Sequence, residues 1–154
     1  AVRMREAGAS MEEVVSWIEE NRDRMCHWVL VDDLKHLHRG GRLPAVAAVA
    51  GIALGIKPLI RVTEEGKLEA IGKVRGRKKG IETLMNKIRE TCVDPENSII
   101  WVVHTDCEEE AKEFCRNVEN TYHPKEIYLS EIGPIIGAHT GPNVLAVVFL
   151  GTHK

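Results

Sequence analysis

The sequence has few aromatic residues, no excess of positive charge and no long apolar run. Phe, Trp and Tyr make up 5% of the 154 residues, and the formal net charge is -2. A general nucleic-acid-binding protein needs a dominant positive field, so this charge argues against that class. The longest weakly polar stretch, residues 44–56, is well short of the ~20 apolar residues that cross a bilayer. We therefore expect neither nucleic-acid binding nor stable membrane insertion.

Cysteines are present, but they form no metal-binding or disulfide pattern. They are Cys26, Cys92, Cys107 and Cys115. No CxxC pair occurs among them, and the chain is not a small cysteine-dense scaffold that needs disulfides. His36 and His38 lie close together in the sequence, but no third ligand is suitably spaced. We expect reduced, partly buried thiols, no metal site and a cytoplasmic location.

The motifs of several enzyme classes are also missing. No Ser or Cys stands in a nucleophile-elbow pattern, and neither a GxGxxG nor a Walker motif occurs. A small acyl-transfer or hydrolytic enzyme that used His139 as its base would need such a nucleophile. That enzyme is kept as an alternative. Because the sequence shows no such nucleophile, we expect no catalysis by this chain and no cofactor.

The spacing of apolar residues predicts six strands and four or five helices. The expected strands span 27–31, 57–62, 67–74, 98–104, 125–129 and 144–150, and the expected helices span 9–25, 34–37, 44–55, 76–92 and 106–120. Ser10 and Glu13 have the spacing of a capping box, and Gly66 is expected in a hairpin turn. Because the hairpin interrupts the alternation of strands and helices, we expect an α/β (α+β) fold, with a mixed, largely antiparallel six-stranded sheet packed with helices.

The segment 44–55 is apolar on every side, and most of its residues are small. Pro44 suits the first turn of a helix, and Gly55 suits its end. A helix without a polar face must be buried on nearly every side. Small side chains such as that of Ala48 leave room beside the helix for a long apolar ligand. The segment therefore predicts a buried helix next to a ligand tail.

Polar residues and glycines occur together in three other segments. Residues 37–42 end in Arg42, and an arginine there can pair with a carboxylate or phosphate. Residues 73–79 place five basic side chains at the start of a helix, which favours an anion. Residues 133–142 form an expected loop containing His139, a possible donor to an anion. A surface arginine, a solvated charge run and a structural histidine are the simpler interpretations. Together the segments favour a site for an acid with a long apolar tail.

At these residues the chain resembles the DegV family. The similarity runs from AGASMEEVVSWIEENRDR through VDDLKHLHRGGRL, GIKPLI and GKLEAIGKVRGRKKG to EIGPIIGAHTGPNVLAVVFLG. Members have two domains and are about twice this long. The resemblance implies the carboxyl-terminal domain type, with a helix over 1–25 leading in from a missing amino-terminal domain and a lipid-binding domain over 26–154. The first residue is Ala1 rather than Met, as expected for an excised fragment.

The resemblance also implies a function and a set of site residues. Family members hold a long-chain fatty acid in an apolar tunnel and present its carboxylate to a separate fatty-acid kinase. The expected ligand-binding residues are Arg42, Ala48, His139, Thr140 and Gly141, and the expected kinase-contact residues are Arg75 and Arg77. A substrate-binding subunit of a dihydroxyacetone-kinase-like system is an alternative, because that family shares the related amino-terminal fold. Two positions beside His139 depart from the family pattern: Ala138 replaces a frequent threonine and Asn143 a preferred glycine.

Overall fold

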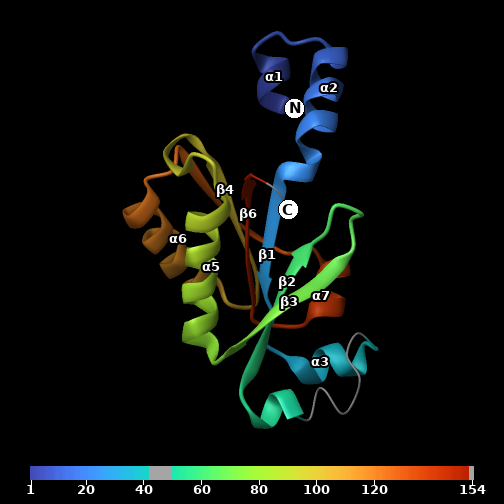
Figure 1. Ribbon diagram of the computed structural model, residues 1–154, viewed down its shortest axis with the longest axis vertical. Helices are drawn as coiled ribbons and strands as arrows, with labels where there is room; N and C mark the ends of the chain where they lie inside the picture. Colours follow the sequence, from blue (N-terminus) through green and yellow to red (C-terminus); the bar gives the residue numbers. More distant parts are fainter. Residues whose placement is uncertain (42–49, 153–154) are drawn as a thin grey trace.

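The described residues are built around one six-stranded sheet (Figure 1). The computed structural model describes residues 1–41 and 50–152. The strands are β1 (Met25–Leu30), β2 (Ile56–Val62), β3 (Leu68–Arg75), β4 (Ile99–Thr105), β5 (Glu126–Glu131) and β6 (Val144–Leu150). Their order across the sheet is β3-β2-β1-β6-β4-β5, and only the β4–β5 pair is parallel. The mixed, largely antiparallel sheet expected from the sequence is confirmed.

The helices follow the sequence pattern closely in the middle of the chain. They are α1 (Val2–Glu6), α2 (Met11–Asn21), α3 (Leu34–Arg39), α5 (Arg77–Thr91), α6 (Glu108–Tyr122) and α7 (Pro134–Thr140), with 3-10 turns at Arg22–Arg24 and Pro95–Asn97 and a helical turn over 50–53. Ser10 accepts a hydrogen bond from the Glu13 amide, and Glu13 accepts one from the Ser10 amide. The predicted capping box is therefore confirmed, although the helix that it starts is shorter than expected.

The main core lies between one face of the sheet and the pair α5 and α6, which cover the same side (Figure 1). Alternate residues of the strands point into it: Cys26, Trp28 and Leu30 of β1, Ile100 and Val102 of β4, and Leu145, Val147 and Phe149 of β6. The helices add Leu84, Ile88, Ala111, Phe114 and Val118. Gly80 brings α5 close to β1, because a Cβ there would lie 2.5 Å from a methyl carbon of Leu30.

The opposite face of the sheet is less covered. The Trp101 side chain is 46% exposed and packs beside Tyr128, with ring centroids 4.9 Å apart. Only alternate residues of β4 face the core, so the strand expected over 98–104 is buried on one side alone. At one end of this face, α3 covers a smaller apolar cluster of Val31, Leu34, Leu37 and Val144.

Two further expectations need correction at the end of the molecule that carries α3 and α7. The segment 133–142, expected as a loop, is mostly a helix, because α7 spans Pro134–Thr140. It is also exposed to solvent, since 77% of the surface of Ile135 is accessible. The predicted helix 44–55 lies largely outside the described residues. Its described turn is not buried all round, because Ile52 is 41% exposed. Apolar composition predicts burial only where another element covers the helix.

The amino-terminal helices extend beyond the end of the sheet (Figure 1). The apolar side of α2 faces solvent there, through Met11, Val15, Trp17 and Ile18. Arg3 of α1 is joined to Glu126 of β5 by an ion pair, which holds α1 to the edge strand. In residues 1–41 and 50–152, no helix is both long enough and apolar enough to span a membrane.

Candidate functional site

Two of the three polar segments predicted from the sequence meet where α3 lies beside α7. The His36 ring nitrogen Nε2 is 2.7 Å from the carbonyl oxygen of Ala138. A Cβ on Gly141 would lie 2.7 Å from Cγ of His36, and Gly141 has φ +82°. Only glycine meets both conditions, because a side chain would collide with the histidine and strain the backbone.

Thr105, at the end of β4, anchors the residues that follow α7. Its hydroxyl donates to the carbonyl oxygen of Gly141 over 2.7 Å and accepts from the amide of Val144 over 2.9 Å. The carbonyl of Thr105 accepts from the Asn143 amide over 2.7 Å. Asn143 has φ +58°, a region that Asn tolerates better than most residues. A glycine, which the resemblance noted in the sequence leads us to expect at this position, would adopt the same conformation without strain.

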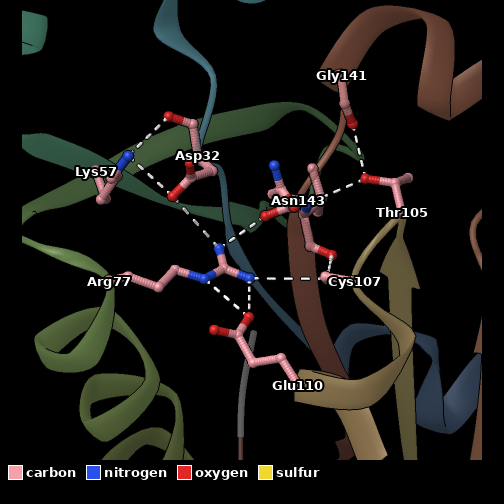
Figure 2. A network of polar contacts seen from close by, with 9 residues as sticks. Asp32, Lys57, Arg77, Thr105, Cys107, Glu110, Gly141 and Asn143 are labelled. Atoms are coloured by element: carbon pink, nitrogen blue, oxygen red, sulfur yellow. Dashed lines mark hydrogen bonds and ion pairs between the residues drawn. The ribbon is translucent and has the colours of Figure 1, made fainter.

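The third polar segment, residues 73–79, reaches the chain around Asn143 through Arg77, the first residue of α5 (Figure 2). Its Nη1 donates to the carbonyl oxygen of Asn143 over 2.7 Å, and its Nε donates to Oε2 of Glu110 over 2.9 Å. Nη1 is also 3.8 Å from Oδ1 of Asp32. The side chain is 21% exposed, so its charge is used mainly within the protein.

Asp32 lies between two cations (Figure 2). The Lys57 Nζ is 2.9 Å from Oδ1 of Asp32 and donates to the Asp32 carbonyl oxygen over 3.2 Å. With Arg77 and Glu110, these residues form a network with equal numbers of positive and negative groups. Because the side chains are partly shielded from water, the network orders the loop after β1 more firmly than exposed pairs would.

Cys107, at the start of α6, joins this network as a weak donor and acceptor. Its thiol donates to the Val144 carbonyl oxygen over 3.2 Å and accepts from Nη2 of Arg77 over 3.7 Å. Burial raises the pKa of the thiol, and the nearby Arg77 opposes this effect only in part. A protonated thiol is a poor nucleophile, so the arrangement favours a structural role for Cys107.

A cavity of about 330 Å³ opens beside the network. It is lined by Asp32, Asp33, Leu34, Lys35, Ile52, Gly55, Ile56, Lys57, Pro142 and Asn143. The lining combines charged side chains, those of Asp32, Asp33, Lys35 and Lys57, with apolar ones, those of Leu34, Ile52, Ile56 and Pro142. The cavity therefore offers both a polar and an apolar surface to a ligand.

The predicted site residues lie at different distances from this cavity. Arg42 and Ala48 fall outside the described residues. His139 is exposed on α7, and the Thr140 hydroxyl is buried and donates to the Ile136 carbonyl oxygen. Gly141 directly precedes the cavity-lining Pro142. The two predicted kinase-contact residues differ, since Arg75 is exposed at the end of β3 and Arg77 points inward.

Sequence reasoning missed Asp32, Lys57, Thr105 and Glu110. The only local signal was the pair of acidic residues, Asp32 and Asp33, that follows the end of β1 after one intervening residue. Their partners are remote in the sequence, and no periodic pattern connects them. Within the described part of the chain, no group of three or more His, Cys, Asp or Glu residues could hold a metal ion.

Comparison with known proteins agrees with this architecture. Residues 1–152 match a family model described as "Uncharacterised protein, DegV family". A DegV domain-containing protein of Clostridium perfringens is 40% identical over all of this chain and 53% of its own length. The chain thus spans about half the length of the curated relatives it matches.

Solved structures give the same result. A DegV family protein from Thermus thermophilus, described as binding fatty acid, matches with a TM-score of 0.80 and 27% identity, over 97% of this chain and 53% of its own. A DegV family protein from Ruminococcus gnavus, refined with vaccenic acid, matches with a TM-score of 0.79 and 26% identity, over 95% of this chain and 52% of its own.

Proposed function

Because this chain belongs to the DegV family, we propose that it is the carboxyl-terminal half of a cytoplasmic carrier that holds a long-chain fatty acid and performs no catalysis itself. The observation that carries the proposal is the likeness, over nearly the whole chain, to family structures described as fatty-acid-binding or refined with a fatty acid. A carrier needs an apolar surface for the tail and a polar one for the carboxylate. The cavity beside the Arg77 network offers both.

The headgroup end of the ligand site is proposed to lie at the junction of α3 and α7. An ionised carboxylate leaving water must be paired or hydrogen-bonded, since an unpaired charge costs several kcal/mol to bury. Arg42 and His139 are the proposed partners, with Thr140 and Gly141 shaping the backbone around them. The acyl chain is proposed to run beside the apolar segment that contains Ala48.

Exposed apolar side chains on α2 and on the sheet are the evidence that a second structural unit packs against this chain. Four apolar side chains of α2 face solvent, and so do Trp101 and Tyr128 on the sheet. Contiguous apolar surface on a soluble protein commonly marks a contact site. We propose that residues 1–25 lead in from an amino-terminal domain, and that this domain covers these surfaces and supplies further partners for the carboxylate.

The proposed contact with a fatty-acid kinase centres on Arg75. It is exposed at the end of β3 and near in sequence to the exposed basic residues Lys73, Lys78 and Lys79, of which Lys79 pairs with Glu82. Like charges at one place repel one another unless a partner of opposite charge binds them. Because the guanidinium of Arg77 is bound inside the protein, we propose that its contribution to the kinase contact is indirect.

Native mass spectrometry of the full-length protein after mild purification tests the carrier function. We expect a long-chain fatty acid to co-purify, and vaccenic acid to displace a fluorescent fatty acid in a saturable titration. A shorter acid such as octanoate is the control, since it leaves most of the apolar surface unfilled. A protein that carries no lipid and shows no saturable binding would contradict the proposal.

The 154-residue chain by itself provides a second test. We expect it to fold, since the sheet and the core covered by α5 and α6 lie within it, and to bind the same probe much more weakly than the full-length protein. Circular dichroism checks the folding and the titration checks the affinity. Equal affinity in both proteins would show that a second domain is unnecessary for headgroup binding.

A further inference from the structure

Two consecutive residues, Gly76 and Arg77, make hydrogen bonds or ion pairs with all three walls of the cavity. The walls are formed by residues 32–35, 52–57 and 142–143. The amide of Gly76 donates to the carbonyl oxygen of Gly55 over 2.9 Å. Arg77 donates to the carbonyl oxygen of Asn143 over 2.7 Å and lies 3.8 Å from a carboxylate oxygen of Asp32. The start of α5 therefore connects segments that are far apart in the sequence.

Glu110 fixes the orientation of the Arg77 guanidinium. It accepts from Nε and from Nη2 of the same group, so two nitrogens of the planar fork are bound on one side. Glu110 lies in the first turn of α6, which packs with α5 over the main core. The third nitrogen, Nη1, is left pointing toward Asn143 and Asp32 (Figure 2). A rigid, planar cation of this kind sets distances that a flexible ammonium cannot.

We propose that Arg77 is a positioning residue, which holds the three cavity walls at the spacing that the bound acid requires without touching the acid. This rests on the proposed fatty-acid-binding function. Arg77 does not belong to the described residues that line the cavity, whereas its partners Asp32 and Asn143 do. Lys57 reinforces the arrangement by joining the wall at 52–57 to Asp32 over 2.9 Å.

The test compares variants at Arg77 with a matched variant elsewhere. Arg77→Met removes every contact, and Arg77→Lys keeps the charge but cannot span Glu110 and Asn143 together. Arg24→Met is the control, since Arg24 is also partly buried and donates to the Gly151 carbonyl oxygen and to Asn21, each over 3.1 Å. Each full-length variant is measured for vaccenic acid affinity, for amide hydrogen exchange and for unfolding by urea.

We expect both Arg77 variants to weaken vaccenic acid binding by about tenfold, and to speed amide exchange in all three walls together. Arg24→Met should lower the resistance to urea while leaving affinity within about twofold. Unchanged exchange at the walls in Arg77→Lys and Arg77→Met, or exchange that rises only in α5, would overturn the proposal. Arg77 variants that bind vaccenic acid as the wild type does would overturn it as well.

The exchange measurement also separates this proposal from the function on which it rests. If the wild-type protein binds no fatty acid, the proposed function fails. Faster exchange at residues 32–35 and 52–57 and at Asn143 in the Arg77 variants would then still support the connection between Arg77 and the walls. If the wild-type protein binds fatty acid and only the Arg77 effects are missing, the positioning role fails and the carrier function stands.

Discussion

Gly141 and His36 are packed so closely that no side chain fits between them. A Cβ on Gly141 would lie 2.7 Å from Cγ and 2.9 Å from Cβ of His36. The ring of His36 cannot easily move away, because its Nε2 is hydrogen-bonded to the Ala138 carbonyl oxygen. This contact joins α3 to α7 at the place where two of the polar segments predicted from the sequence converge.

We therefore expect Gly141→Ala to lower the free energy of unfolding by about 2 kcal/mol or more, from backbone strain and the collision with His36. Urea unfolding followed by circular dichroism measures the change. Gly137→Ala, inside the helix α7 that Gly141 directly follows, is the matched control, since its Cβ would meet Thr105 Cγ2 at an ordinary 3.8 Å. That variant should be stabilised by about 0.5–1 kcal/mol, because alanine favours a helix. Equal effects of the two variants would contradict the packing described.

Thr105→Val should measure how much the two hydrogen bonds of the Thr105 hydroxyl, made to the chain around Asn143, contribute to the free energy of unfolding. Valine has nearly the same shape, so the loss of about 1–3 kcal/mol that we expect comes from the unpaired backbone groups of Gly141 and Val144. Thr83→Val is the control, because the Thr83 hydroxyl bonds only within the exposed turn of its own helix. Urea unfolding of both variants makes the comparison, and a Thr105→Val variant as stable as Thr83→Val would refute the anchoring role.

Acid should weaken the attachment of α1 to the sheet. A hydrogen bond from Tyr128, and then one from Arg3, lowers the pKa of Glu126 in the folded protein. Because the folded pKa is below the unfolded one, the stabilisation is present at neutral pH and is lost as pH falls through the folded pKa. NMR titration of the Glu126 carboxyl carbon should therefore give a midpoint below ~4.3, the ordinary value for glutamate.

Two variants identify the cause of that shift. Tyr128→Phe should raise the Glu126 midpoint more than Arg3→Ala does, since the tyrosine hydroxyl makes the larger contribution. A midpoint for Glu126 that does not move in either variant would show that neither contact lowers its pKa.

Arg75→Ala should slow phosphorylation of the bound fatty acid by the kinase without weakening fatty-acid binding. The Arg75 side chain is exposed, and Arg75 is not among the described residues that line the cavity, although its backbone pairs with that of the lining residue Ile56. We therefore expect fatty-acid affinity within about twofold of the wild type and formation of acyl-phosphate slowed by about tenfold. Arg116→Ala, which removes an exposed basic residue of α6, should change neither. Wild-type acyl-phosphate formation by Arg75→Ala would mean that Arg75 belongs only to a solvated charged surface.

Much of the fold was determined by local sequence pattern. The continuous apolar run at the carboxyl end predicted β6 with the bounds Val144–Leu150 that the structure has. Gly66, with φ +75°, lies in the predicted hairpin turn, and Ser10 with Glu13 starts α2 as its capping box predicts. These features depend on residues within a few positions of one another, so their physical causes are visible in the sequence.

The candidate site depended on contacts that no local pattern contains. Arg77, Asp32, Glu110 and Asn143 come from four separate parts of the chain, and only the packing of α5, α6 and the sheet brings them together. The sequence predicted an anion site at the basic segment, but the direction of each arginine depends on whether a carboxylate from elsewhere meets it. Arg75 has the same residue type and nearly the same position as Arg77 and faces solvent instead. The sequence by itself therefore determined which segments carry the polar chemistry, and the tertiary structure alone decided which of those side chains act inside the protein.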